Sequence, residues 1–230
     1  MTLSVYGTNM KHFICTMDRF ANIIGKNKGD ILLLLPHADD ELMGCGGLLN
    51  GLRLMKATVR AIYFTDGSRC DQAGKDIVSI RHKEAEEALK FMGMHNLEFL
   101  DVADRTLRQN RKFIANKIEY ELEKFDYSLI VAPSINDRHP DHRVLGRQTN
   151  LLQKRYGIPV LFYEVWGRMR KPNFWFPLED AFFGTLYQWC RYYQSQFGLE
   201  QMLYQKLRYR GGQIGFRFAE AYRLVGMELK

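Results

Sequence analysis

Residues 31–41, ILLLLPHADDE, join a continuous apolar run to a cluster of ionisable side chains. Five aliphatic residues in succession, Ile31 to Leu35, are typical of a strand that is buried on both faces of a parallel sheet. The run ends at Pro36, and the next five residues contain one histidine and three carboxylates. In open parallel sheets, ligands bind just beyond the carboxyl ends of the strands. This stretch therefore predicts an α/β fold and the edge of the sheet at which a functional site lies.

Apolar runs and stretches with helical patterning alternate along the chain. The expected strands are Ile31–Leu35, Thr58–Thr65, Leu97–Val102, Ser128–Ala132 and Pro159–Val165. The expected helices are Leu42–Met55, Asp76–Met92, Leu107–Phe125 and His142–Tyr156. Strands that alternate with helices are typical of a parallel sheet covered on both faces. We therefore expect a Rossmann-like, three-layer α/β fold with a mostly parallel sheet.

Length and composition indicate one globular domain. The chain has 230 residues, enough to bury a sizeable core in a single domain. Hydrophobic residues make up 46% and charged residues 26%, which excludes a disordered or fibrous protein. We expect residues 1–230 to form a single domain, with residues 1–30 as an N-terminal extension and residues 187–230 as a C-terminal cap.

The charge of the chain is uneven. Its 33 basic and 26 acidic side chains give a net charge of +7, and residues 151–230 carry +6 of it. The same segment contains 19 of the 30 aromatic residues. A basic, aromatic-rich segment could bind nucleic acid, an anionic substrate, a membrane surface or a partner chain. Because the sequence has no nucleic-acid-binding motif, we do not expect nucleic acid as a partner, and a homo-oligomer remains open.

Cysteine spacing and hydropathy suggest a cytoplasmic location. The four cysteines, Cys15, Cys45, Cys70 and Cys190, lie far apart and form no CxxC pair, which favours reduced thiols. No apolar run approaches the roughly 18–20 residues of a membrane span, so no transmembrane segment is predicted. Charged residues interrupt the first 30 positions, which argues against a secretory signal.

Histidines and carboxylates collect after two of the expected strands. His37, Asp39 and Asp40 follow the first strand, and His139 and His142 follow the fourth. Adjacent carboxylates in a cleft are costly unless a cation neutralises them. His37 and Asp40, three residues apart, can face one point from the first turn of a helix. Two histidines and one carboxylate are a usual catalytic zinc set.

Each cluster alone has a simpler explanation. The acids of the first cluster could cap a helix N-terminus, and the second cluster could be a turn with solvated histidines. Their common position at the ends of strands favours a metal site. The native metal stays open between zinc and other divalent ions, because such a ligand set can also hold iron or cobalt.

The motifs PHADDE (36–41) and HPDH (139–142) together resemble those of the PIG-L/LmbE-like family of zinc-dependent deacetylases. Members of this family remove acetyl groups from N-acetylglucosamine and related amino sugars. Weaker similarities are found at residues 65–67, 81–84, 193–196 and 219–223, so the resemblance covers most of the chain from Ile31 onward. The family usually has proline where Ala38 stands, a departure that leaves every functional group in place.

This resemblance implies a role for each residue of the two motifs. His37, Asp40 and His142 would be the metal ligands, Asp39 the general base, and His139 the group that assists the transition state. Zinc would activate water, and Asp39 would take the proton and pass it to the leaving amine.

Four further residues are candidates for supporting roles. The resemblance implies that Arg81 binds substrate, whereas its pattern alone would place it on a solvated helix face. Asp141 could orient one of the histidines or simply form a turn. Glu84 is expected to brace loops, and Asp66 to lie behind the metal ligands or to form a turn.

The predicted function is metal-dependent hydrolysis of an N-acetylated amino sugar, such as an N-acetylglucosamine glycan or glycoconjugate, with release of acetate. Two alternatives remain: hydrolysis of another N-acyl conjugate at the same zinc site, and a non-enzymatic basic binding module. We also hypothesise that Arg168, Arg170 and Lys171 attract an anionic substrate. Residues 170–177 could wall the substrate groove with aromatic side chains or form a subunit interface.

Overall fold

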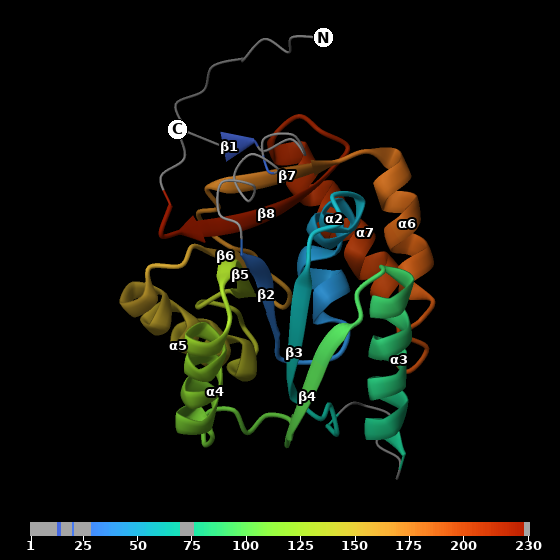
Figure 1. Cartoon of the computed structure of the whole chain (residues 1–230). Helices are drawn as coiled ribbons and strands as arrows, with labels where there is room; N and C mark the ends of the chain where they lie inside the picture. The colour runs from blue at the N-terminus through green and yellow to red at the C-terminus, as the bar shows by residue number, and fades with distance from the viewer. Residues whose placement is uncertain (1–12, 15–19, 21–28, 70–75, 228–230) are drawn as a thin grey trace.

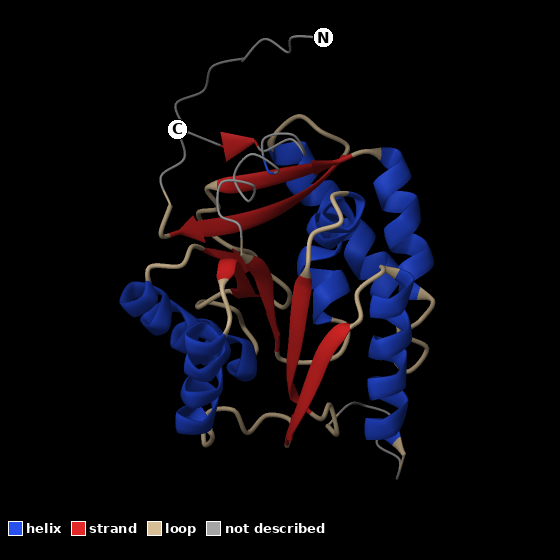
Figure 2. Ribbon diagram, viewed as in Figure 1, coloured by secondary structure: helices blue, strands red, loops and turns tan. Residues whose placement is uncertain are grey.

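The computed structural model describes residues 13–14, 20, 29–69 and 76–227 and shows an α/β/α sandwich (Figure 1). In this part of the chain, eight strands form a sheet in the order β1-β7-β8-β6-β5-β2-β3-β4, with helices on both faces (Figure 2). The strands are β1 (Phe13–Ile14), β2 (Asp30–Leu35), β3 (Val59–Thr65), β4 (Asn96–Val102), β5 (Tyr127–Pro133), β6 (Val160–Tyr163), β7 (Phe174–Leu178) and β8 (Phe218–Val225). The helices are α2 (Asp40–Leu54), α3 (Ile77–Phe91), α4 (Arg111–Lys124), α5 (Pro140–Tyr156), α6 (Asp180–Cys190) and α7 (Leu199–Gln213). The predicted three-layer fold in a single domain is confirmed.

Strand β2 is apolar throughout because both of its faces are buried. Ile31, Leu33 and Leu35 belong to the core that packs against α2, α3, α6 and α7. Leu32 and Leu34 point the other way, into the core formed with α4 and α5. Side chains of a strand alternate between the two faces of its sheet, so a continuous aliphatic run serves both cores.

The sheet reverses its strand order beside β2. The chain passes from β2 outward to β3 and β4, and then returns to β5 on the other side of β2. Strands β2–β6 pair in parallel, and β8 is antiparallel to both β6 and β7. The loops after β2 and β5 therefore diverge from neighbouring carboxyl ends, which is the usual ligand-binding position in such sheets.

Segment 170–177 differs from its prediction. Phe174, Trp175 and Phe176 lie in strand β7, and each is only 1% exposed, so they form neither a groove wall nor an exposed interface. Pro172 before this strand and Pro177 within it hide the strand in the sequence. Strand β8 is hidden for a different reason: its apolar pattern is interrupted by the buried carboxylate of Glu220.

The two ends of the chain add strands to the sheet. Segment 187–230, predicted as a cap of the domain, supplies α7 and also β8, which lies inside the sheet between β6 and β7. The N-terminal extension, residues 1–30, falls mostly outside the described residues, and its described strand β1 pairs with β7. Cys45 and Cys190 are free thiols, whereas Cys15 and Cys70 lie outside the described residues. Among the described helices, none is long and apolar enough to cross a membrane.

Candidate metal centre and active site

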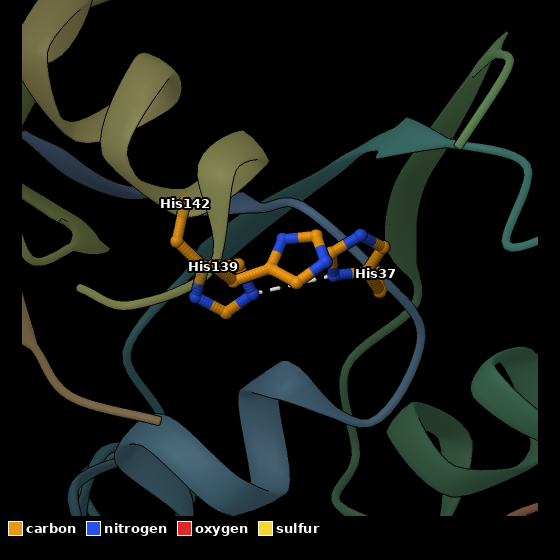
Figure 3. A group of neighbouring side chains, drawn as sticks. All are labelled: His37, His139 and His142. Carbon is orange, nitrogen blue, oxygen red and sulfur yellow. Dashed lines mark hydrogen bonds between the residues drawn. The ribbon is translucent and has the colours of Figure 1, made fainter. Parts of the chain in front are cut away.

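Two strand ends, those of β2 and β5, bring the histidine and carboxylate side chains together. His37 and Asp39 follow β2, and Asp40 begins helix α2. His139 precedes the first residue of α5, and His142 lies in the first turn of that helix. Figure 3 shows the three histidine rings meeting between these two segments, although His37 and His142 are separated by 105 positions in the sequence.

Three side-chain atoms form a compact triangle at this point. Asp40 Oδ2 lies 3.1 Å from His37 Nδ1 and 3.1 Å from His142 Nε2, and the two nitrogens are 3.3 Å apart. Ligand atoms at about 2.0–2.1 Å from a tetrahedral zinc are separated by about 3.3 Å from one another. The triangle therefore has the size of three corners of a zinc coordination tetrahedron.

Burial and charge also favour a cation here. Asp40 is 1% exposed, and its Oδ1 atom has no hydrogen-bond partner among the described residues. Burial by itself lowers the pKa of His37, but the carboxylates of Asp104, Asp141 and Asp40 outweigh that effect and raise the pKa well above its ordinary value. A site that favours the protonated form of a buried histidine has a negative potential. A divalent cation would neutralise that potential.

Other ligand combinations overlap with this triangle. His37, His139 and His142 lie close enough to share an ion, as do His37, Asp104, His139 and Asp141. The Nδ1 atom of His139, however, accepts a hydrogen bond from the backbone N–H of Asp141 at 3.3 Å. We therefore favour His37, Asp40 and His142 as the ligand set.

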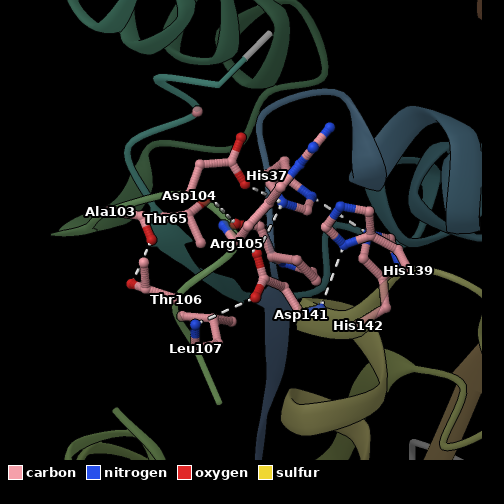
Figure 4. Close-up of polar contacts among 12 residues, drawn as sticks. His37, Thr65, Ala103, Asp104, Arg105, Thr106, Leu107, His139, Asp141 and His142 are labelled. Atoms are coloured by element: carbon pink, nitrogen blue, oxygen red, sulfur yellow. Dashed lines mark hydrogen bonds and ion pairs between the residues drawn. The ribbon is translucent and has the colours of Figure 1, made fainter. Parts of the chain in front are cut away.

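Asp104 contacts His37 of the ligand triangle, and the sequence analysis missed it. Its Oδ1 lies 3.0 Å from His37 Nε2, the ring nitrogen that faces away from the triangle (Figure 4). A carboxylate in this position fixes the tautomer and the orientation of a ligating histidine. Asp104 follows strand β4, which is the expected strand Leu97–Val102. Inspection of the residues beyond the carboxyl end of that strand would therefore have found it.

Two predicted supporting carboxylates hold the loop that carries Asp104. Asp66 Oδ1 accepts from the backbone N–H of Asp104 at 3.1 Å. Asp141 accepts from the backbone N–H groups of Arg105 at 2.7 Å and Leu107 at 3.1 Å (Figure 4). Asp141 Oδ2 also lies 3.5 Å from His37 Nε2. Both residues thus fix the position of the loop from which Asp104 reaches His37.

Asp137 is a second residue that the sequence analysis did not single out. It is 2% exposed, and its Oδ1 accepts from the backbone N–H of His139 at 2.9 Å. Its Oδ2 accepts from the backbone N–H groups of Val165 and Trp166, both at 3.2 Å, and lies 3.7 Å from His142 Nδ1. Asp137 therefore ties the HPDH loop to the segment after β6.

Asp39 has the surroundings of a proton acceptor. Its φ of 99° places it in the left-handed region, which is uncommon for a residue with a side chain and is often found at functional sites. Burial and the adjacent Asp40 raise its pKa to about 7, although Arg81 opposes them from 4.0 Å. Its carboxylate lines the pocket, and among the described residues it has no hydrogen bond to the ligand triangle, so it can exchange a proton with a ligand.

His139 has the surroundings of a neutral hydrogen-bond donor. Burial lowers its pKa to about 4, and the neighbouring His37 and His142 add to this effect. Because Nδ1 accepts from the Asp141 backbone, the ring proton of the neutral form is on Nε2. That N–H group is available to a substrate oxygen.

Arg81 and Glu84 fasten neighbouring loops to helix α3. Arg81 donates to the carbonyl oxygens of Gly67 at 3.1 Å and Ala38 at 2.8 Å, and so supports the backbone between His37 and Asp39. Glu84 accepts from both the backbone N–H and the hydroxyl of Ser195, at 2.7 and 2.5 Å. The substrate-binding role of Arg81 stays a prediction, and the contacts of Glu84 agree with a bracing role.

A pocket of about 250 Å³ opens over the ligand triangle. Its wall combines histidines, carboxylates, three arginines, one amide and one indole, which suits a polar ligand with many hydroxyl groups. The lining residues are His37, Asp39, Arg69, Arg81, Asp104, Arg105, His139, Trp166 and Gln196.

Comparison with known proteins links this site to one family. The sequence model of the PIG-L family, described as GlcNAc-PI de-N-acetylase, matches residues 32–151. A probable N-acetyl-α-D-glucosaminyl L-malate deacetylase 2 of Bacillus cereus is 32% identical over 127 residues, which are 51% of this chain and 57% of that relative. The chain thus matches little more than half the length of this relative.

Solved structures show that the fold extends beyond the matched segment. The N,N′-diacetylchitobiose deacetylase of Pyrococcus horikoshii superposes with a TM-score of 0.71 at 23% identity, covering 91% of this chain and 88% of that one. The 4-carboxy-2-hydroxymuconate hydratase of Pseudomonas putida reaches the same TM-score at 16% identity, covering 88% and 98%. Because a deacetylase and a hydratase share this fold, the fold alone does not identify the reaction, which depends on the residues of the site.

Proposed function

Because this chain belongs to the PIG-L family, we propose that it is a metal-dependent hydrolase that removes the acetyl group from an N-acetylated amino sugar. The observation that carries the proposal is the triangle of His37 Nδ1, Asp40 Oδ2 and His142 Nε2, with edges of 3.1, 3.1 and 3.3 Å. Asp39 and His139, which line the same pocket, would act on the substrate.

The reaction breaks the amide C–N bond and forms a new C–O bond, so that acetate and a free amine are released. When bound, zinc or another divalent ion would make water nucleophilic near neutral pH and would polarise the amide oxygen. Asp39 accepts the proton of the attacking water and then delivers it to the departing nitrogen. The carboxylate is suited to both steps because it is half-buried at the pocket wall and outside the ligand triangle.

His139 stabilises the negative charge that develops on the amide oxygen. Its Nε2–H group donates a hydrogen bond in the neutral form, so it needs no added proton near pH 7. Asp137 fixes the position of this ring through the backbone N–H of His139. Asp104 binds Nε2 of His37 and so keeps Nδ1 of the same ring at its corner of the ligand triangle.

The size and polarity of the pocket support a sugar as the acylated group. A volume of about 250 Å³ is at or below the lower end of typical ligand sites, so the pocket suits a single small unit of a substrate. Arg69, Arg81, Arg105 and Gln196 supply hydrogen-bond donors for hydroxyl groups, and Trp166 supplies an apolar face for a sugar ring.

The test is acetate release from N-acetylglucosamine and N,N′-diacetylchitobiose by zinc-loaded protein, compared with the Asp39→Asn variant. We expect wild-type protein to release acetate and the variant to lose roughly 10²–10⁴-fold in kcat, because the proton acceptor is gone while the ligands remain. Metal content is measured in parallel and should be equal in the two proteins. Near wild-type turnover by Asp39→Asn would exclude Asp39 as the base, and no acetate from any N-acetylated sugar would refute the activity.

A further inference from the structure

Two cavities larger than the catalytic pocket lie near it, and one of them shares the lining residue Trp166. Trp166, which is 51% exposed, lines both the catalytic pocket and a cavity of about 640 Å³ between helix α7 and the segment after β6. A third cavity of about 750 Å³ shares four lining residues with the second: Asn136, Gly167, Arg168 and Arg170. The two cavities share this part of their walls and are here together called the distal groove.

The distal groove is strongly basic. Five of its described lining residues are exposed cations: Arg138, Arg168, Arg170, Lys171 and Arg223. Glu164 is the one acid among the described lining residues, and the buried guanidinium of Arg210 binds both of its oxygens at 2.7 and 2.5 Å. No lining carboxylate is therefore left to neutralise the cations, and the groove attracts anions.

The wall of the groove is held in place by buried contacts. Arg210 also donates to the carbonyl oxygen of Met169 at 2.9 Å, and Glu164 accepts from the backbone N–H of Met169 at 2.5 Å. These bonds fasten Met169, the residue that follows Arg168. The guanidinium carbon of Arg168 lies 3.9 Å from the ring centroid of Tyr209 on α7. A guanidinium that is stacked in this way loses little freedom when it binds an anion.

The groove is also fixed relative to the catalytic pocket. Asp137 binds the backbone N–H groups of Val165 and Trp166 at one side and that of His139 at the other. The same carboxylate therefore sets the distance between the proposed oxyanion donor and the start of the basic segment. A substrate that spans both spaces would meet a preformed surface.

From this arrangement we propose that the distal groove binds an anionic group, a phosphate or a carboxylate, attached to the N-acetylated sugar. The inference rests on the proposed function, since it assigns the part of the substrate that the catalytic pocket of about 250 Å³ leaves outside. Arg168 is the specificity-determining residue, because it lines both cavities and is positioned by Tyr209. Arg170 acts with it, and bidentate guanidinium contacts suit both kinds of anion.

The experiment compares charged and neutral probes. The charged probes are UDP-N-acetylglucosamine and N-acetylglucosamine 1-phosphate for phosphate, and N-acetylmuramic acid for carboxylate; N-acetylglucosamine and diacetylchitobiose are the neutral probes. Binding is measured by calorimetry on proteins that carry Asp39→Asn. The value of kcat/KM is measured by acetate release, on proteins that keep the wild-type catalytic residues. The groove variant is Arg168→Gln/Arg170→Gln. The control is Arg191→Gln/Arg208→Gln, an equal charge change at exposed arginines outside the lining residues.

We expect protein with an intact groove to bind at least one charged probe at least tenfold more tightly than the neutral probes. The groove variant should reduce that preference at least tenfold, and the control should retain it. The phosphate and carboxylate arms identify the preferred anion. Equal binding of charged and neutral probes, or equal losses in both variants, would overturn the subsite.

The two proposals fail separately. If acetate is released without a charge preference, the subsite is wrong and the deacetylase activity stands. If charged probes bind through Arg168 and Arg170 but no N-acetyl group is hydrolysed, the activity is wrong and the anion site stands.

Discussion

Asp104 offers the sharpest test of how the metal centre is held. Its carboxylate lies 3.0 Å from His37 Nε2, and it belongs to no motif that the sequence displays. If His37 Nδ1 binds the metal, Nε2 carries the proton and donates it to Asp104. Replacing Asp104 with asparagine keeps the shape and one acceptor oxygen but removes the negative charge.

The size of the effect follows from the type of hydrogen bond. A bond to a charged partner contributes about 1.5–3 kcal/mol and a neutral one about 0.5–1.5 kcal/mol, so the exchange costs about 1–1.5 kcal/mol. Since about 1.4 kcal/mol corresponds to tenfold in an equilibrium constant, zinc affinity should fall about five- to tenfold in Asp104→Asn. Asp104→Ala, which removes the acceptor altogether, should approach the upper end of the 10–100-fold range seen for such partners.

The assay is competition for zinc between the protein and a chromophoric chelator at pH 7. The matched control is Asp101→Asn, which removes the same charge three positions earlier. Asp101 has its side chain 64% exposed and pairs with His82, away from the ligand triangle. If both variants bind zinc as tightly as wild type, Asp104 does not orient His37. Equal losses in both would instead indicate a general effect of charge.

The remaining predictions concern the ligand set and the stability of the fold. His142→Ala should lose most of the bound metal in elemental analysis, because one corner of the ligand triangle is removed, and full retention would contradict the assignment. Burial by itself raises the pKa of Glu121, but Arg60 and Lys117 outweigh it and lower the pKa from 4.5 to about 2. The stability from this group is therefore present above about pH 4.5 and is lost as the pH falls toward 2. Glu121→Gln should lower the free energy of unfolding by at most about 3 kcal/mol at pH 7 and by much less at pH 3, as measured by urea titration. An equal loss at both pH values would refute the coupling between ionisation of Glu121 and folding. In Gly146→Ala the new Cβ would lie 2.3 Å from the backbone oxygen of Pro133, the last residue of β5. We expect this substitution to lower the free energy of unfolding by about 1–3 kcal/mol and the Tm by several degrees. The control Gly212→Ala, which has open space around its Cβ, should cost less than about 1 kcal/mol.

Local patterns predicted most of the sheet. All five expected strands are present, and Val160–Tyr163 is only shorter than the expected Pro159–Val165. Strands β2, β3, β5 and β6 are largely buried on both faces, which leaves an apolar run that can be recognised in sequence. Strand β4 lies at the edge of the sheet, and its residues are half-buried or exposed. Strands β7 and β8 do not leave such a run, because prolines flank or enter one and Glu220 lies inside the other. Glu220 is tolerated in the core because its carboxylate accepts from the backbone N–H groups of Gly47 at 2.7 Å and Leu48 at 2.9 Å.

For the site, sequence alone identified the two segments whose histidines and carboxylates the fold brings together. His37, Asp39 and Asp40 lie within four residues of one another, and His139 and His142 within four, so each cluster is visible as a local motif. The position of both clusters after buried strands predicted that they would meet, because parallel strands end at the same edge of the sheet.

Only the tertiary structure decided what surrounds those clusters. Asp104 reaches His37 across 67 positions, and Asp137 joins His139 to Trp166, which lies on a separate segment. For the distal groove, the sequence pointed to Arg168, Arg170 and Lys171, which are close together in the chain. That Arg138 and Arg223 line the same cavities, beside α7, is decided by the tertiary structure. Spacing along a sequence reports which side chains share a turn or a strand, whereas contacts between elements depend on how the whole sheet and its helices pack. Residues within or next to a motif were therefore predictable, whereas Asp104 and Asp137, which reach the motifs from other positions, were not.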